Sequence, residues 1–126
     1  MTLRALTTNE RSIISTIAQE LDVPDRLQLL ADLENATART VAQVGSLIEF
    51  EIAGYARPAF RGQHPFDVEG RVRDSDGAEL AVLIHADHNG RLLELELVRF
   101  ERGEVISPDW STLQLYRSNS RETSSE

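Results

Sequence analysis

Two histidines and an aspartate lie within four positions of one another in the stretch VLIHADHNGRLLELE, residues 82–96. His85, Asp87 and His88 are residue types that bind zinc or transfer protons. A strand turns alternate side chains to opposite faces, so residues 85 and 88 would diverge, and residue 88 falls at a turn. The spacing therefore argues against a zinc site, and we expect neither a metal nor another cofactor.

A histidine between two carboxylates is the other arrangement that could do chemistry. Asp67, His85 and Glu94 would form one row across three neighbouring strands, in the register argued below. Flanking carboxylates could fix the imidazole tautomer for acid–base chemistry. However, an open sheet surface does not exclude water, and no serine or cysteine nucleophile can be placed beside the row. We therefore interpret the row as a solvated charge ladder and predict that the protein is not an enzyme.

The first third of the chain, which must support these residues, has the periodicity of two helices. Apolar residues recur at the spacing of one helix face at Ile13, Ile14, Ile17, Ala18 and Leu21. Thr7 and Glu10 predict a capping box before them, and Pro24 suits the first turn of a second helix that runs to about Asn35. So short a connection predicts an antiparallel helix pair that covers a sheet. In the second helix we expect Leu27, Leu30 and Ala31 to face inward, with Leu29 and Leu33 toward the flanks.

From Thr40 onward the period of the apolar residues is two, as in strands with one wet face. In SLIEFEI, residues 46–52, Ile48, Phe50 and Ile52 alternate with Glu49 and Glu51. Residues 54–65, rich in glycine, proline and arginine, form a long connection. Three further strands follow: FDVEGRV (66–72), AELAVLIHA (78–86) and RLLELELVRF (91–100). The expected fold class is α+β, with the N-terminal antiparallel helix pair packed on one face of a four-stranded, or slightly larger, antiparallel β-meander.

Two turns set the register of this meander. Asn89-Gly90 is typical of a type I′ hairpin turn, which pairs His88 with Arg91. The buried face then contains Leu80, Val82, Ile84, Leu93, Leu95 and Leu97. In DSDGA, residues 74–78, a three-residue loop with a left-handed Gly77 keeps Val68, Gly70 and Val72 on that face, whereas a two-residue turn would bury Arg71 and Arg73.

The opposite, wet face of the sheet gathers carboxylates. Glu69 and Glu96 should lie beside the row of Asp67, His85 and Glu94, and Glu49 and Glu51 extend this face if their strand is adjacent. The long connection adds aromatic and guanidinium side chains, the types enriched at binding hot spots: Tyr55, Arg57, Phe60 and Arg61. We predict that these residues of the sheet and the connection contact a partner.

The C-terminal segment carries fewer signals. SPDWSTLQLY, residues 107–116, predicts a helical turn that docks Trp110 and Leu113 on the edge of the sheet. Residues 117–126 contain no apolar side chain and should be disordered. We therefore expect a single α+β domain over residues 1–116 and a tail over residues 117–126.

Composition limits the classes of function. The basic residues number 13, all arginine, against 21 acidic ones, which gives a net charge of −8 and a pI near 4.9. Such a charge repels nucleic acid and favours basic partners. No apolar run is long enough to cross a membrane, no secretory leader is visible, and cysteine is absent. We expect a cytoplasmic protein, a monomer or weak homodimer, that binds neither nucleic acid nor membrane.

The opening LTTNERSII, the helix pair ending in RLQLLADLENA and the block DSDGAELAVLIHADHNGRLLELEL together resemble a group of small bacterial domains of uncharacterised function. More loosely, residues 6–100 resemble the immunity proteins of contact-dependent growth inhibition and other polymorphic toxin systems. That resemblance implies a small, acidic, catalytically inert cytosolic protein that binds one cognate toxin, often a basic nuclease. It assigns no functional residue.

The resulting prediction is a non-catalytic immunity protein, or antitoxin, that neutralises a basic toxin domain through an acidic sheet face, because complementary charge steers such partners together. Two alternatives remain open. A small-molecule-binding or regulatory domain predicts a closed apolar pocket between helices and sheet, and an enzyme predicts a cleft that contains His85.

Overall fold

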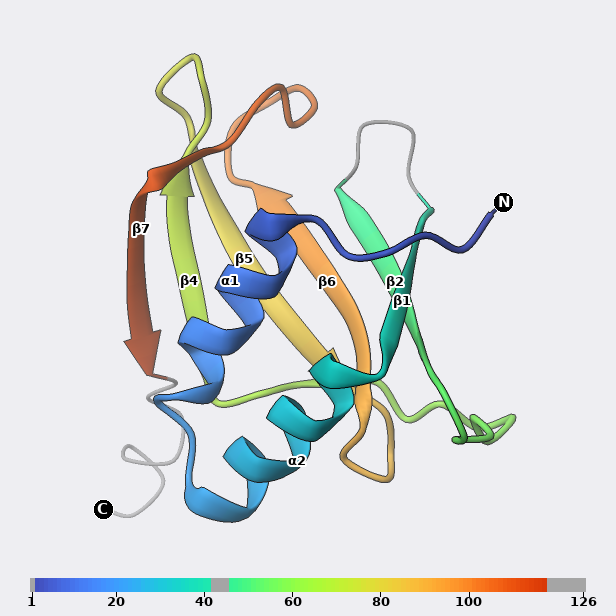
Figure 1. Cartoon of the computed structure of the whole chain (residues 1–126). Coiled ribbons are helices and arrows are strands. Elements are labelled where there is room, and N and C mark those ends of the chain that lie inside the picture. The colour runs from blue at the N-terminus through green and yellow to red at the C-terminus, as the bar shows by residue number, and fades with distance from the viewer. Residues whose placement is uncertain (1, 42–45, 118–126) are drawn as a thin grey trace.

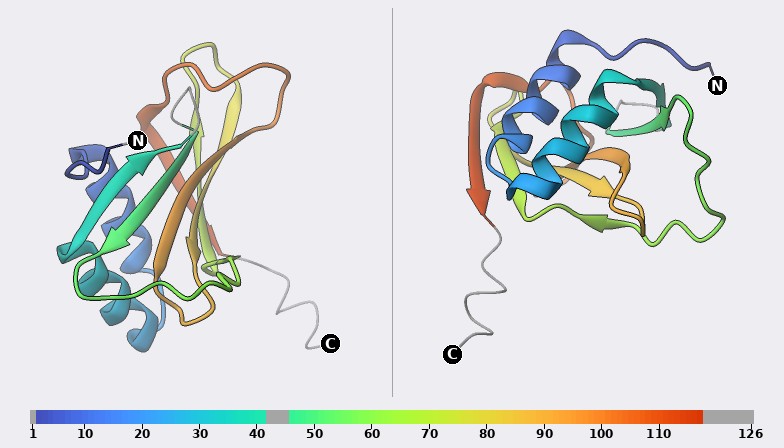
Figure 2. Two further views of the ribbon diagram at one scale, coloured as in Figure 1. Left: turned by 90° about the vertical axis from the view of Figure 1, so that its right-hand side faces the viewer. Right: turned by 60° about the horizontal axis from the view of Figure 1, so that its bottom comes forward.

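The computed structural model describes residues 2–41 and 46–117 of the chain. Within these residues, two helices cover one face of a seven-stranded antiparallel sheet (Figure 1). The side view in Figure 2 shows both helices packed on the same side of the strands. The α+β class and the N-terminal helix pair are thus confirmed, but the sheet has more strands than the four counted in the sequence.

Helix α1 (Thr8–Ala18) begins at the predicted capping box. The backbone N–H of Glu10 donates to Oγ1 of Thr7 over 3.1 Å, and the N–H of Thr7 donates to Oε1 of Glu10 over 2.9 Å. A cap of this kind stabilises a helix by about 1 kcal/mol. The periodicity also identified the correct inner face, because Ile13, Ile14, Ile17 and Ala18 are buried.

Helix α2 (Val23–Glu34) has Pro24 in its first turn, as predicted, but it buries a different face. Leu29 and Leu33 are buried, whereas Leu27 and Ala31 are exposed, so the expectation that Leu27 and Ala31 face inward is wrong. Leu30, the third residue expected inward, is partly buried and packs against the core. Asp32 lies on the true inner face and is only 1% exposed, because Arg91 pairs with it there. Because leucines lie on two sides of this helix, the sequence does not show which side is buried. The buried side is the one that carries Leu29 and the Asp32–Arg91 ion pair.

The strands of the sheet are β1 (Ala36–Thr40), β2 (Leu47–Ile52), β3 (His64–Pro65), β4 (Val68–Arg73), β5 (Glu79–Ala86), β6 (Leu92–Arg99) and β7 (Asp109–Arg117). They are ordered β1-β2-β6-β5-β4-β7, with the two-residue β3 paired to β5. Four of them, β2, β4, β5 and β6, are the strands that the sequence predicts, and β2 is adjacent to β6 as expected. β1 and β7 form the two edges.

Strand β7 replaces the helical turn predicted for residues 107–116. It pairs with β4 in an antiparallel register that shifts once along the pair. The extra residues at this irregularity let Trp110 and Leu113 both pack against the core at a helix-like spacing of three. Arg117, which the sequence assigned to the tail, is the last residue of β7, and residues 118–126 lie outside the described residues.

Both hairpins that flank β5 use the same kind of turn. In the turn over residues 74–78, Gly77 has a φ of 89°, which confirms the predicted three-residue loop. Gly90 has a φ of 77° in the second turn, but no non-glycine residue of the described chain has a positive φ. The type I′ turn predicted at Asn89-Gly90 is therefore wrong. Instead the N–H of Gly90 donates to the carbonyl of Asp87, and a single left-handed glycine closes the turn.

The changed turn alters the predicted buried face at only one position of β6. The side chains expected there are all buried: Leu80, Val82, Ile84, Leu93, Leu95 and Leu97. A bulge after His85 places Ala86 opposite Leu92, so Leu92 joins the helix-covered core. The side chain of Leu93 lines a cavity on the other face. The core is thus the predicted one, changed by one leucine at the bulge.

Candidate functional site

The sheet surface opposite the helices, here called the open face, carries the side chains that alternate with the buried ones. Its charged and aromatic members include Arg39, Glu49, Glu51, Glu69, Arg71, His85, Glu94, Glu96 and Tyr116. Glu94 lies between two cross-strand neighbours, Glu49 of β2 and His85 of β5. The strand order therefore brings the predicted carboxylates of β2 and β6 together beside one histidine.

His85 and Glu94 are buried, which contradicts the predicted solvated ladder. Residues 54–63, here called the covering loop, wrap around this end of the sheet (Figure 2). Arg61 and Gln63 of the covering loop both donate to the Glu94 carboxylate. The prediction failed because it did not place the long connection over the sheet. There its guanidinium and amide groups donate hydrogen bonds to the Glu94 carboxylate and remove it from water.

The predicted row of Asp67, His85 and Glu94 is only partly formed. His85 does lie opposite Glu94, but its neighbour on the other side is Pro65 of β3. The chain changes register between β3 and β4, and this leaves Asp67 exposed in the connection. Nε2 of His85 lies 2.9 Å from Oε1 of Glu96, so the histidine pairs with a glutamate of the next row.

The carboxylates of β2 are paired with arginines. Arg39 of β1 contacts Glu49 over 3.5 Å and Glu51 over 3.1 Å. Arg61 of the covering loop contacts Glu49 over 3.3 Å and Glu94 over 3.0 Å. This part of the open face is therefore a lattice of alternating charges and not the acidic row that the sequence predicts. The sequence analysis missed this pairing because it did not predict strand β1, which supplies Arg39.

Arg71 organises a second group on the open face, of which the sequence singled out only Glu69. Its Nε donates to Glu69 over 2.9 Å, and this hydrogen bond raises the pKa of Arg71. The Arg71 guanidinium carbon lies 5.0 Å from the ring centre of Phe100 and 5.4 Å from that of Tyr116, within cation–π range. Both rings are about half exposed, and a cavity of about 340 Å³ adjoins Arg71 and Tyr116. Sequence reasoning missed Tyr116 because it expected a helical turn there.

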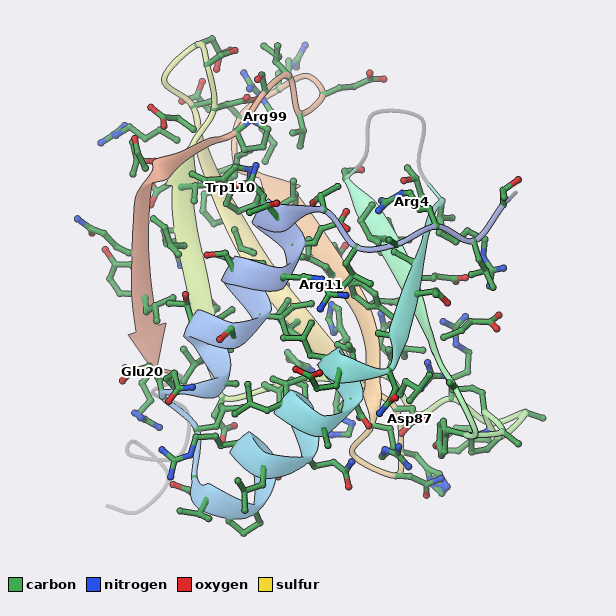
Figure 3. The ribbon with its side chains drawn as sticks, viewed as in Figure 1. Arg4, Arg11, Glu20, Asp87, Arg99 and Trp110 are labelled. Carbon is green, nitrogen blue, oxygen red and sulfur yellow. The ribbon has the colours of Figure 1, made fainter. Side chains whose placement is uncertain are left out.

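The covering loop is held to the β5–β6 hairpin by Asp87, whose side chain is fully buried (Figure 3). Oδ2 of Asp87 accepts from the Tyr55 hydroxyl over 2.6 Å and from Nη1 of Arg57 over 2.9 Å. Oδ1 accepts from the backbone N–H groups of Asn89 and Arg91. Burial alone would raise the pKa of Asp87, but these hydrogen bonds outweigh it and lower the pKa to about 2. Tyr55 and Arg57, two of the predicted contact residues, thus anchor the loop.

A second buried carboxylate joins helix α2 to the same hairpin. Asp32 accepts from Nη2 of Arg91 over 2.8 Å and from the backbone N–H of Leu92 over 3.0 Å. The hydrogen bond to Asp32 raises the pKa of Arg91. The Arg91 guanidinium also lies 4.2 Å from the centre of the Tyr55 ring. Helix, hairpin and covering loop are therefore connected through one polar cluster at this end of the sheet.

Five of the predicted contact residues line one cavity of about 310 Å³: Glu49, Glu51, Tyr55, Arg57 and Arg61. Arg39, Phe50, Ile52 and Leu93 complete its lining. Because this lining contains no serine, threonine, histidine or cysteine, the cavity presents no side-chain nucleophile of those types. It is a charged cavity on the open face and differs from the closed apolar pocket between helices and sheet expected of the ligand-binding alternative.

The remaining predicted residues lie around the tip of the covering loop. Phe60 is exposed, and its ring centre is 5.6 Å from that of His88. The backbone N–H of His88 donates to the carbonyl of Arg61 over 2.6 Å. His88 is therefore a contact point for the loop. Among residues 2–41 and 46–117, no group of three or more histidine, cysteine, aspartate or glutamate side chains is arranged to hold a metal ion.

None of the helices in the described ranges combines the length and apolar character needed to cross a bilayer.

Comparison with known proteins places the chain in one family. No curated protein and no solved structure gives a significant match. A family model matches residues 3–108, a span that includes both helices, the covering loop and strands β1 to β6. The chain therefore belongs to the family described as a domain of unknown function, DUF6984.

Proposed function

We propose that the protein is a non-catalytic immunity protein that binds and neutralises a cognate toxin domain through its open face. The observation that supports this proposal is the composition of that face. Arginine and aromatic side chains, the types enriched at binding hot spots, lie there on a hydrogen-bonded sheet that holds them in place. The lining of the cavity that collects the predicted contact residues contains no serine, threonine, histidine or cysteine, which fits action by occlusion.

The partner proposed is a basic toxin domain, such as a nuclease, because the chain carries a net charge of −8. The net charge of the whole protein accelerates encounter with a basic partner. At contact, the Arg39–Glu51 pair can be exchanged, because the Glu51 side chain is 54% exposed and exposed pairs contribute only about 0–1 kcal/mol. A toxin arginine can therefore take the place of Arg39. We place this activity in the cytoplasm, with a monomer or weak homodimer that binds neither nucleic acid nor membrane.

Co-expression with the protein encoded by the neighbouring upstream gene tests this proposal. We expect the C-terminal domain of that product to inhibit growth and the immunity protein to restore it through a one-to-one complex. Phe60→Ala should weaken the complex roughly tenfold or more, because exposed aromatic side chains at an interface are common hot spots. The matched control is Ile106→Ala in the β6–β7 connection, an exposed apolar residue outside the open face, which should leave affinity unchanged.

Two outcomes would contradict the proposal. The first is an upstream gene whose product has no effect on growth. The second is a toxin complex whose affinity is the same for the wild type and for the double variant Phe60→Ala, Glu51→Arg. Both substitutions lie at exposed positions, so circular dichroism should show an unchanged fold and the affinity can be read directly.

A small-molecule-binding or regulatory domain is the second candidate, favoured by the 310 Å³ cavity. Because guanidinium and carboxylate groups both line that cavity, the ligand that fits best carries both charges, as a free amino acid does. Thermal unfolding in the presence of each amino acid would reveal such a ligand by a raised Tm. Arg39→Gln, which removes one cavity guanidinium, should then abolish the stabilisation.

A further inference from the structure

A smaller cavity, here called the α1 pocket, lies between the start of helix α1 and the helix-covered face of the sheet. Its volume is about 160 Å³. Its interior is lined by apolar side chains of β2, β6, β7 and the β6–β7 connection: Ile48, Leu95, Leu97, Val105, Pro108 and Trp110. Figure 3 shows Trp110 beside the first turn of α1. Thr7, Asn9 and Glu10 complete the lining, and the pocket opens to solvent there because Thr7 and Asn9 are exposed.

The charged and capping groups at this opening are satisfied by neighbouring groups. Glu10, the one charged residue of the lining, accepts from both terminal nitrogens of Arg4 over 2.9 Å. Oγ1 of Thr7 accepts from the backbone N–H of Glu10 over 3.1 Å. Deeper in the pocket the wall is apolar, and its members from β2, β6 and the connection are at most 8% exposed. The pocket therefore offers apolar contact to a ligand and no unpaired charge.

The volume of the α1 pocket limits the ligand to a single ring. Protein interiors contain few voids larger than a water molecule, and apolar walls give water few hydrogen bonds. An apolar cavity of roughly 150 Å³ holds one benzene ring, whereas drug-sized ligands occupy roughly 300–1,000 Å³. The indole ring of Trp110 in the wall favours an aromatic ligand, because aromatic rings attract one another in offset and edge-to-face arrangements.

We propose that the α1 pocket binds a small neutral molecule with one aromatic ring, of the size of phenol or benzyl alcohol. A neutral molecule fits because Glu10 repels an anion, and a cation would have to compete with Arg4 for Glu10. This inference goes beyond toxin neutralisation and does not depend on it. The pocket lies on the side of the sheet that the helices cover, whereas the proposed toxin contact is the open face (Figure 2).

Fluorescence of Trp110 tests the proposal on the whole protein, because this residue is the single tryptophan of the chain and lines the pocket. Titration with benzyl alcohol should change the fluorescence saturably, with a Kd on the order of 1 mM, as the few atoms of one ring allow. Benzoate carries the same ring with a negative charge, and tert-butylbenzyl alcohol carries it with a bulky substituent. Both control molecules should bind at least about tenfold more weakly.

Val105→Phe and Ile106→Phe are matched variants, because the two residues are neighbours in the β6–β7 connection. Val105 is 6% exposed and lines the pocket, whereas Ile106 is 61% exposed and does not. The ring added by Val105→Phe should fill the pocket and weaken benzyl alcohol binding at least about tenfold, and Ile106→Phe should leave it unchanged. In the wild type, benzyl alcohol should shift amide resonances at the start of α1, in β6 near Leu97 and in the connection. That measurement decides the question even if Val105→Phe fails to fold.

Several results would overturn the inference: no saturable fluorescence change at tens of millimolar benzyl alcohol, equal affinity for benzoate, equal effects of the two variants, or amide shifts confined to the open face. Concentration-dependent dimers that both benzyl alcohol and Val105→Phe dissociate would also overturn it, in favour of a side chain from a second copy. None of these results bears on toxin neutralisation, which is measured by growth. Conversely, a protein that binds benzyl alcohol in the α1 pocket but neutralises no toxin would overturn only the proposed function.

Discussion

Replacement of Asp87 by asparagine removes the negative charge of this residue but keeps an oxygen that can accept the hydrogen bonds of the turn. The remaining oxygen of Asp87→Asn can still accept from the N–H groups of Asn89 and Arg91, which lie 2.9 and 3.0 Å from Oδ1. The new NH₂ group replaces Oδ2 and faces Nη1 of Arg57, so that one donor faces another. Arg57 therefore loses its counter-ion while the hairpin keeps its cap.

The size of the effect depends on how far Arg57 can relax. Its side chain is 20% exposed, and Nη2 also donates to the backbone carbonyls of Phe50 and Leu92 over 2.7 and 2.9 Å. Loss of a hydrogen bond to a charged group costs roughly 1.5–3 kcal/mol, and breaking a fully buried ion pair roughly 3–5 kcal/mol. Because Arg57 keeps two acceptors and some contact with water, we expect Asp87→Asn to lower the free energy of unfolding by about 2–3 kcal/mol.

The difference between Asp87→Asn and the wild type should depend on pH. The pKa of Asp87 is about 2 in the folded protein and roughly 3.9 in an unfolded chain. A lowered pKa stabilises the fold above the unfolded value, and this stabilisation is lost as the pH falls through the folded value. Denaturant unfolding followed by the fluorescence of Trp110, the single tryptophan, should show the difference shrinking by about 1 kcal/mol between pH 7 and about pH 3.

Asp76→Asn is the matched comparison, because Asp76 lies in the turn of the other hairpin, which is of the same kind, and also pairs with an arginine. Arg99 pairs with Asp76 over 2.6 Å but also with Asp74 over 2.8 Å, so it keeps a counter-ion in the variant. We expect Asp76→Asn to cost at least about 1 kcal/mol less than Asp87→Asn, because the Asp76 side chain is 42% exposed. Equal losses in the two variants, or an Asp87→Asn deficit that is the same at both pH values, would refute the counter-ion argument.

Two further predictions concern the covering loop and the first helix. Gly62→Ala should lower the free energy of unfolding by about 2 kcal/mol, because Gly62 has a φ of 57° and the added Cβ would lie 2.4 Å from Cβ of His88. Amide hydrogen exchange in the variant should accelerate more in the covering loop than in β5, and an equal acceleration in both would contradict this. Thr7→Ala should cost about 1 kcal/mol in thermal unfolding, because it removes the cap of α1, whereas the neighbouring Thr8→Ala should cost less than half as much.

The central strands could be predicted from the sequence because burial of one sheet face imposes strict alternation. Leu95 and Leu97 of β6 follow this alternation and are buried, although the type of the turn before β6 was predicted incorrectly. The edge strands escaped prediction. In β1 the buried positions are only two alanines, which make a faint apolar signal, and in β7 an irregularity changes the spacing from two to three.

The candidate site was only partly visible in the sequence for the same reason. Residues such as Glu49, Glu51 and Glu94 come from central strands, so their shared face could be predicted from parity alone. The guanidinium groups that neutralise them come from edge strand β1 and the covering loop, whose positions depend on tertiary contacts such as the Asp87 cluster. A count of carboxylates along strands therefore overestimates the charge of a face when its counter-ions come from irregular segments.

This distinction between total and local charge bears on how the protein selects its partners. The net charge of −8 acts at long range and attracts any basic molecule to the whole surface. On the open face, Arg39 and Arg61 already occupy the carboxylates, so a partner there must match the shape of the ion-pair lattice and displace an existing bond. Shape should therefore govern recognition at the open face, and the net charge of the whole protein should govern only the rate of encounter.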